Sequence, residues 1–124
     1  MSVRLMVCSD LHCGHRVGLT HPDWQTTCSE TAPRHMRKQH EQRMVLWNWF
    51  AEAVRKLRPI HKLIVNGDMV EGGGQRSGGT ENLTNDREEQ AEMAAAAINF
   101  IEADSVAATY GTPYHVGVDC DFEN

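Results

Sequence analysis

The sequence has no apolar run long enough to span a membrane, which needs about 20 consecutive residues, and no recognisable secretory signal. Near the N-terminus, Arg4 is followed by only a short apolar stretch, Leu5 to Cys8, before polar Ser9 and Asp10. This stretch is too short for the hydrophobic region of a signal peptide. We therefore expect a soluble, cytoplasmic protein with no membrane partner.

The four cysteines form no C-x-x-C pair, which is the spacing of common zinc and redox motifs. Without a secretory signal, a framework of two disulfides is the less favoured interpretation, and we expect reduced thiols. Cys8 lies in an apolar segment and is expected in the core. Cys13 lies beside polar residues that follow this segment, where we expect it to be sensitive to oxidation.

The sequence also has few positive charges relative to negative ones, with 12 basic and 17 acidic residues and a net charge of −5. This argues against a protein that coats nucleic acid or an anionic membrane. A phosphate-bearing substrate is still compatible, because bound metal ions reverse the local field. The glycines after Glu71 are not followed by G-K-[ST], so they do not form a P-loop.

The remaining composition is that of one globular domain. The chain has 124 residues, of which 40% are hydrophobic, enough for a single core. We therefore expect one domain covering residues 1–124. No internal repeat is visible.

Three short apolar segments are predicted to be strands, at residues 3–8, 63–65 and 106–110. The first is stopped by polar residues, which suits a buried parallel strand better than a half-exposed one. Residues 14–40 lack periodicity and are predicted to form a long loop.

Two helices are predicted between these strands. The first has apolar residues at helical spacing, Leu46, Phe50, Val54 and Leu57, and Pro59 ends it. Trp47 and Phe50 are expected in the core, with Trp49 off that face. Asn85 and Glu88 form a capping box for the second helix. Its predicted apolar face consists of Ala91, Ala94, Ala95, Ile98 and Ile101. The fold class is thus α/β, a β-α-β-α-β parallel sheet with flanking helices.

Polar residues follow each predicted strand. Asp10 and His12 follow the first, Asp68 the second, and Thr112 and His115 the third. Because ligands bind at the carboxyl ends of parallel strands, we expect these residues to converge on one edge of the sheet.

This combination of residues suits a divalent metal. Asp10 and His12 offer an oxygen and a nitrogen, a mixture that favours Mn²⁺, Fe or Zn²⁺. Asp68 has two oxygens and can bridge two ions, and a two-metal site activates water and holds phosphoryl oxygens. Taken singly, Asp10 or Asp68 is better interpreted as a turn cap. Together, the three favour metal binding.

Two motifs resemble signatures of the calcineurin-like metallophosphoesterases. Ser9-Asp10-Leu11-His12 is similar to D-x-H, and Asn66-Gly67-Asp68-Met69-Val70-Glu71 is similar to G-D-x-x-[DE]. The third signature, G-N-H-[DE], is replaced by Gly111-Thr112-Pro113-Tyr114-His115, a variant similar to phage-type members. The resemblance implies that His115 is catalytic, beside the leaving group, and that Thr112 takes the place of the asparagine.

The family continues with further metal-binding histidines, which this sequence does not contain. The resemblance therefore implies the first half of an αββα sandwich, incomplete at the C-terminus and completed by a second chain or oligomer. It implies a hydrolase of a phosphomonoester or phosphodiester, with a nucleotide or nucleic acid among the candidate substrates. The alternative is a catalytically incomplete metal-binding remnant or subunit.

Other side chains have both a functional and a structural interpretation. His15 and His21 lie near the first motif and are interpreted as solvated more readily than as contacts to substrate or metal. Glu71 is structural or functional in equal measure, and Trp24 is expected to pack rather than to cover the site. The basic cluster of Arg34, Arg37, Lys38 and Arg43 is expected to be a solvated helix start rather than a nucleotide-binding patch.

Overall fold

The computed structural model describes residues 2–74 and 77–112, which form a small α/β unit. In chain order its elements are β1 (Leu5–Cys8), the 3₁₀ helix η1 (Pro22–Trp24), α1 (Arg34–Leu57), β2 (Lys62–Asn66), α2 (Arg87–Ile101) and β3 (Ser105–Thr109). The predicted β-α-β-α-β order is confirmed, and each strand overlaps its predicted segment. Within these residues, neither α-helix combines the length and apolar character needed to cross a bilayer.

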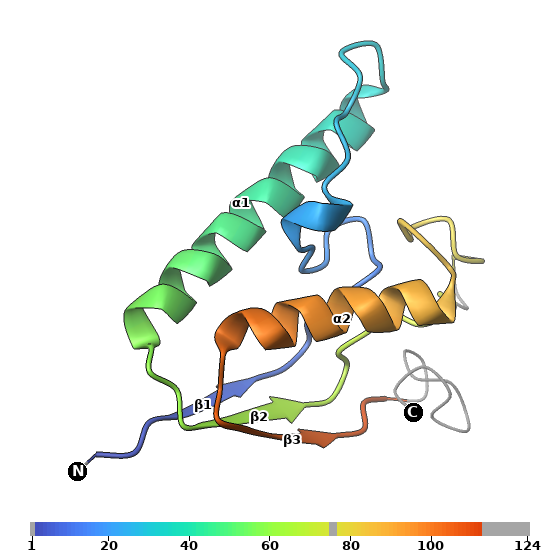
Figure 1. The fold of residues 1–124 in the computed structure, drawn as a ribbon. Helices are drawn as coiled ribbons and strands as arrows, with labels where there is room; N and C mark the ends of the chain where they lie inside the picture. Colours follow the sequence, from blue (N-terminus) through green and yellow to red (C-terminus); the bar gives the residue numbers. More distant parts are fainter. Residues whose placement is uncertain (1, 75–76, 113–124) are drawn as a thin grey trace.

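The strands form one parallel sheet in the order β1-β2-β3, with Val7 opposite Ile64 and Ile64 opposite Ala107. Both α-helices lie on the same face of this sheet (Figure 1), as expected for two successive crossovers of one hand. On the other face, Leu5 and Val7 are 54% and 59% exposed. The prediction of a fully buried first strand is therefore wrong, because both helices cover the same side of it.

Helix α1 begins at Arg34, well inside the segment predicted to be a loop up to His40. This boundary prediction was wrong because the first turns of α1 are polar and carry no apolar periodicity for a pattern to detect. The predicted C-terminal end is confirmed. Arg58 follows the helix in an extended conformation, which is the conformation that a residue before proline favours, and Pro59 comes next.

Helix α2 is capped one residue later than predicted. The Asp86 carboxylate accepts a hydrogen bond from the Glu89 amide at 2.9 Å, so Asp86, rather than Asn85, is the N-cap. The predicted apolar face is also partly wrong, since Ala91 and Ala95 are exposed. The buried residues of α2 are Gln90, Met93, Ala94, Ala97 and Ile101.

The core lies between the helices and the covered face of the sheet. Leu63 and Val65 of β2 are fully buried, and Trp47 and Phe50 of α1 are 5% and 6% exposed. The rings of these two α1 residues lie 5.4 Å apart, which confirms their predicted place in the core. Trp49 is 67% exposed, so it lies off the core face, as predicted.

Candidate metal centre

The segments that follow β1 and β2 continue side by side beyond the ends of the strands. The His12 amide donates to the Asp68 carbonyl at 3.1 Å, and the Cys13 amide donates to the Met69 carbonyl at 3.0 Å. The Glu71 amide donates in turn to the Cys13 carbonyl at 3.0 Å. The parallel ladder is thereby extended into both loops, and this extension fixes the first motif against the second.

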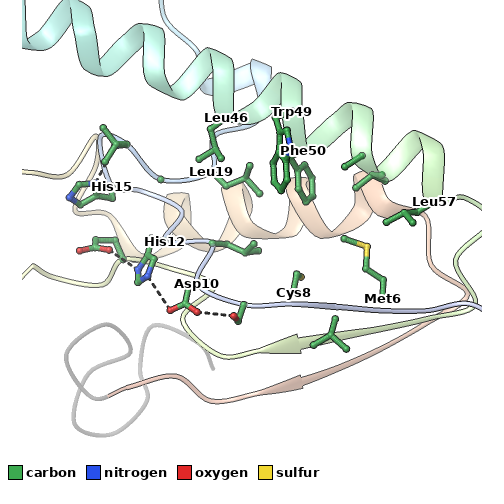
Figure 2. Close-up of a pocket in the computed structure, with 18 residues that line it drawn as sticks. Met6, Cys8, Asp10, His12, His15, Leu19, Leu46, Trp49, Phe50 and Leu57 are labelled. Carbon is green, nitrogen blue, oxygen red and sulfur yellow. Dashed lines mark hydrogen bonds and ion pairs between the residues drawn. The ribbon is translucent and has the colours of Figure 1, made fainter.

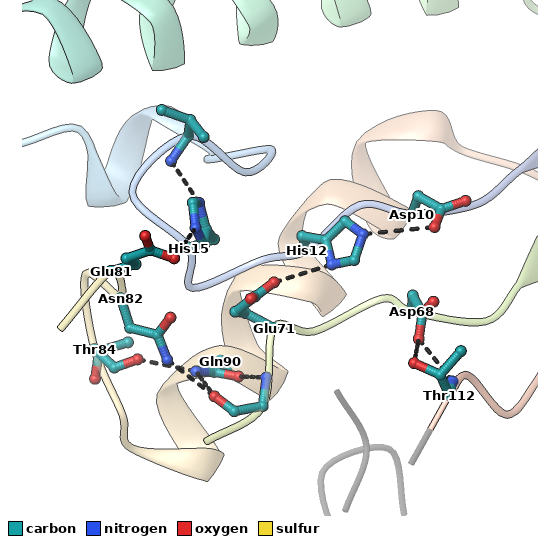
Figure 3. Close-up of polar contacts among 12 residues, drawn as sticks. Asp10, His12, His15, Asp68, Glu71, Glu81, Asn82, Thr84, Gln90 and Thr112 are labelled. Atoms are coloured by element: carbon teal, nitrogen blue, oxygen red, sulfur yellow. Dashed lines mark hydrogen bonds and ion pairs between the residues drawn. The ribbon is translucent and has the colours of Figure 1, made fainter. Parts of the chain in front are cut away.

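Three of the predicted ligands lie together at this edge of the sheet. Asp10, His12 and Asp68 each offer one ligand atom, and these atoms all lie within 4.8 Å of one another (Figure 3). His12 Nε2 is 3.5 Å from Asp10 Oδ1. The Asp10 side chain is 64% exposed and that of His12 27% exposed, so the cluster is accessible from solvent. Two carboxylates and one imidazole form a donor set that suits Mn²⁺, Fe or Zn²⁺.

Glu71 lies against the inner nitrogen of the histidine in this cluster. Its Oε2 lies 3.0 Å from His12 Nδ1, and the Glu71 side chain is only 10% exposed. A carboxylate at Nδ1 favours a proton on that nitrogen, which leaves Nε2 as the ligand atom that faces Asp10. The structural and the functional interpretation of Glu71 are therefore compatible. Its side chain is buried, and it also contacts a candidate metal ligand.

Asp68 is held from the opposite side by the chain after β3. The Thr112 amide donates to Asp68 Oδ1 at 2.8 Å, and the Thr112 hydroxyl lies 3.3 Å from the same oxygen. This approach is possible because two glycines face each other. A Cβ on Gly67 would lie 2.9 Å from the Gly111 Cα, and a Cβ on Gly111 would overlap the Asp68 carboxylate.

The three candidate ligands also share an uncommon backbone conformation. Among the described residues, the non-glycine residues with positive φ are Asp10 (58°), His12 (47°), Asp68 (50°) and Glu102 (58°). Glu102 is the C-cap of α2, a common place for a left-handed residue. Asp and His tolerate this region better than most residues, yet it still costs free energy, and such outliers concentrate at functional sites.

The other histidines near the first motif do not join the cluster. His15 Nδ1 accepts a hydrogen bond from the Val17 amide at 3.1 Å, and its Nε2 lies 3.6 Å from Glu81. His21 caps η1, and its ring packs against Trp47 with centroids 4.9 Å apart. His21 therefore has a structural role, whereas His15 remains at the margin of the site.

Two predictions about charged or reactive groups near this region need correction. Cys13 is fully buried, and burial raises the pKa of its thiol to about 12, so the expected sensitivity to oxidation is not supported. Arg43 is not solvated but 6% exposed, and it donates to the Arg16 carbonyl at 2.7 Å. The other members of the basic cluster are exposed.

Some residues that shape the site were missed at the sequence level. Gln90 is fully buried, and its amide nitrogen donates to the carbonyls of Gly72 and Thr84 at 3.0 and 2.9 Å, which anchors the chain just after Glu71. No sequence pattern indicates a buried glutamine. A glycine shortly after a strand, such as Gly111, is in contrast a signal that a sequence can show. The predicted catalytic residue, His115, lies outside the described residues.

Comparison of the chain with protein-family models, curated proteins and solved structures gave no match.

Proposed function

We propose that this chain is a metal-dependent phosphoesterase similar to the calcineurin-like metallophosphoesterases. The observation that carries the proposal is the meeting of Asp10, His12 and Asp68, whose ligand atoms lie within 4.8 Å of one another although they come from two motifs far apart in the sequence. When bound at such a site, divalent cations polarise phosphoryl oxygens and activate water for attack on phosphorus. The reaction class is hydrolysis of a phosphomonoester or phosphodiester.

Each residue of the candidate site has a separate role in this proposal. His12 presents Nε2 because Glu71 lies at Nδ1, and Asp68 is kept in place through Oδ1 by Thr112. Asp68 is the proposed bridge between two ions, with Mn²⁺ first and Fe or Zn²⁺ next in preference. His115 is proposed to orient the phosphate or to protonate the leaving group. Nucleotides and nucleic acids are the first substrates to screen.

The test is hydrolysis of bis-p-nitrophenyl phosphate with Mn²⁺, together with a count of bound metal. Asp68→Asn should abolish turnover and lower metal content, because it removes the proposed bridging carboxylate. Asp104→Asn is the matched control: it removes one exposed carboxylate at the opposite end of β3 and should leave both quantities unchanged. Equal activity in the two variants would refute the proposal.

The same assay tests His115. If it acts on the phosphate or on the leaving group, His115→Ala should lower turnover roughly 100-fold or more, as for loss of a general acid, while metal content stays the same. A matching loss of metal would instead make His115 a ligand.

A second candidate function is a metal-binding subunit without turnover of its own, completed by another chain. It is favoured by the apolar side chains on the open face of the sheet, where Leu5 and Val7 are more than half exposed, since exposed apolar surface marks interaction sites. This candidate predicts bound metal, no hydrolysis by the isolated chain, and an oligomer in light scattering.

A further inference from the structure

An apolar groove leads away from the candidate metal centre between β1 and α1. Its volume is about 770 Å³, which is within the usual range for small-molecule sites. In Figure 2, His12 and Asp10 lie toward one end of the lining residues, while Met6 and Leu57 lie toward the other. The groove and the cluster are therefore continuous.

The polar and apolar parts of the lining are separated along the groove. Besides Ser9, its polar side chains are those of the site and its margin, Asp10, His12, His15 and Glu71. The long wall is apolar and includes Met6, Cys8, Leu46, Trp49, Ala53 and Leu57. A ligand with one anionic end and one apolar end matches this separation better than a ligand that is polar throughout.

Part of the apolar wall is open to solvent. Trp49 is 67% exposed and Leu57 is 44% exposed, although both line the groove. Along α1, the wall extends from Leu46 to Leu57, which is roughly 16 Å at 1.5 Å per residue. Large apolar side chains exposed over such a length provide a binding surface that water solvates poorly.

We infer that the groove binds the apolar substituent of a phosphoester whose phosphate lies at Asp10 and His12. The inference rests on the proposed function and specifies its substrate class: esters with an alkyl or aryl group that is long enough to reach Trp49. A small or fully polar ester would reach the same metal ligands but leave the wall of α1 exposed.

The expected effect follows from burial of methylenes. Full burial of one methylene changes an affinity roughly fourfold. Because Trp49 and Leu57 remain partly open to solvent, we expect about half of that free energy, which is roughly twofold per methylene. A methyl and a butyl ester differ by three methylenes, so KM should be about eightfold lower for the butyl ester. The value of kcat should stay the same, since the alkyl group contributes equally to ground-state and transition-state binding.

The experiment compares methyl phosphate with butyl phosphate, each measured by release of inorganic phosphate, in the intact chain with Mn²⁺, because neither ester carries a second apolar group that would compete for the groove. Ala53→Asp places a charge in the wall and should reduce the ratio of the two KM values to about one. Asn48→Asp adds the same charge at an exposed position of α1 that does not line the groove, and should keep the eightfold ratio. Equal KM values for both esters in the unaltered chain would overturn the inference.

Binding is measured separately from hydrolysis by tryptophan fluorescence. Butylphosphonate should shift the emission to shorter wavelength more strongly than methylphosphonate, and Trp49→Phe should remove this shift. If this difference is seen without any hydrolysis, the groove is supported while the phosphoesterase proposal fails. If the emission of Trp49 is instead already blue-shifted and depends on protein concentration, another polypeptide occupies the groove, and the inference is overturned.

Discussion

A single methyl group added at Gly111 should disturb the candidate metal centre, although no candidate metal ligand is itself substituted. A Cβ at this position would overlap both Oδ1 and the amide nitrogen of Asp68. Gly111 is not among the glycines with positive φ, so its backbone conformation is open to alanine and the effect of Gly111→Ala is steric. Either the Asp68 carboxylate or the chain after β3 must move.

The size of the effect follows from the hydrogen bonds at stake. Thr112 approaches Asp68 Oδ1 with its amide at 2.8 Å and its hydroxyl at 3.3 Å. Both groups are exposed, so water replaces them when they separate and the lost hydrogen bonds cost little. The overlap with the Asp68 backbone nitrogen must also be relieved, and we therefore expect a loss of stability of about 1–3 kcal/mol. Metal affinity should fall roughly 10–100-fold, as is typical when the groups that orient a ligand are lost.

Calorimetric titration with Mn²⁺ and thermal unfolding of the metal-free chain measure these two effects. Gly73→Ala is the matched control, because a Cβ there meets no atom within 4 Å and its φ is not positive. Wild-type Mn²⁺ affinity in a folded Gly111→Ala variant would show that the contact between Thr112 and Asp68 does not position a ligand.

Two further predictions concern buried groups beside the site. Glu71→Gln should lower Mn²⁺ affinity about tenfold because it weakens the orientation of His12. The control, Glu81→Gln, alters the exposed carboxylate beside His15 and should leave Mn²⁺ affinity unchanged. Equal losses of affinity in the two variants, measured by calorimetry, would contradict the role of Glu71. The second prediction concerns Cys13, whose thiol pKa is raised by burial from 9.0 to about 12. Its contribution to stability should be complete below pH 9 and decline above it by about 1.4 kcal/mol per pH unit. Urea unfolding should therefore show a steeper loss between pH 9 and 11 than in Cys13→Ala, and parallel curves would refute this.

The order of elements was predictable because strands and helices here alternate as short apolar runs and a clear helical stripe. The convergence of Asp10, His12 and Asp68 was predictable for a related reason: parallel strands bring their carboxyl ends to one edge. No side-chain detail was needed for that step, only the position of each residue after its strand.

Other features depend on contacts that a pattern does not contain. The polar beginning of α1 gives no apolar periodicity. The burial of Arg43 depends on contacts such as its hydrogen bond to the Arg16 carbonyl, which comes from a distant part of the sequence. Exposure of Val7 follows from both helices covering the same face, which is a property of the whole topology. The role of Gly111 depends on how closely the segment after β3 approaches Asp68, and this distance is not visible in the sequence.

The conformation of the cluster costs stability, and the proposed metal binding would account for that cost. Left-handed backbone at Asp10, His12 and Asp68 costs on the order of 1 kcal/mol or more at each residue, and bringing two carboxylates together adds repulsion. The bonds between the two loops, from His12 to Asp68 and from Cys13 to Met69, maintain this arrangement against both costs. Since a bound cation would turn the repulsion into attraction, the same geometry that weakens the metal-free fold would strengthen a metal complex.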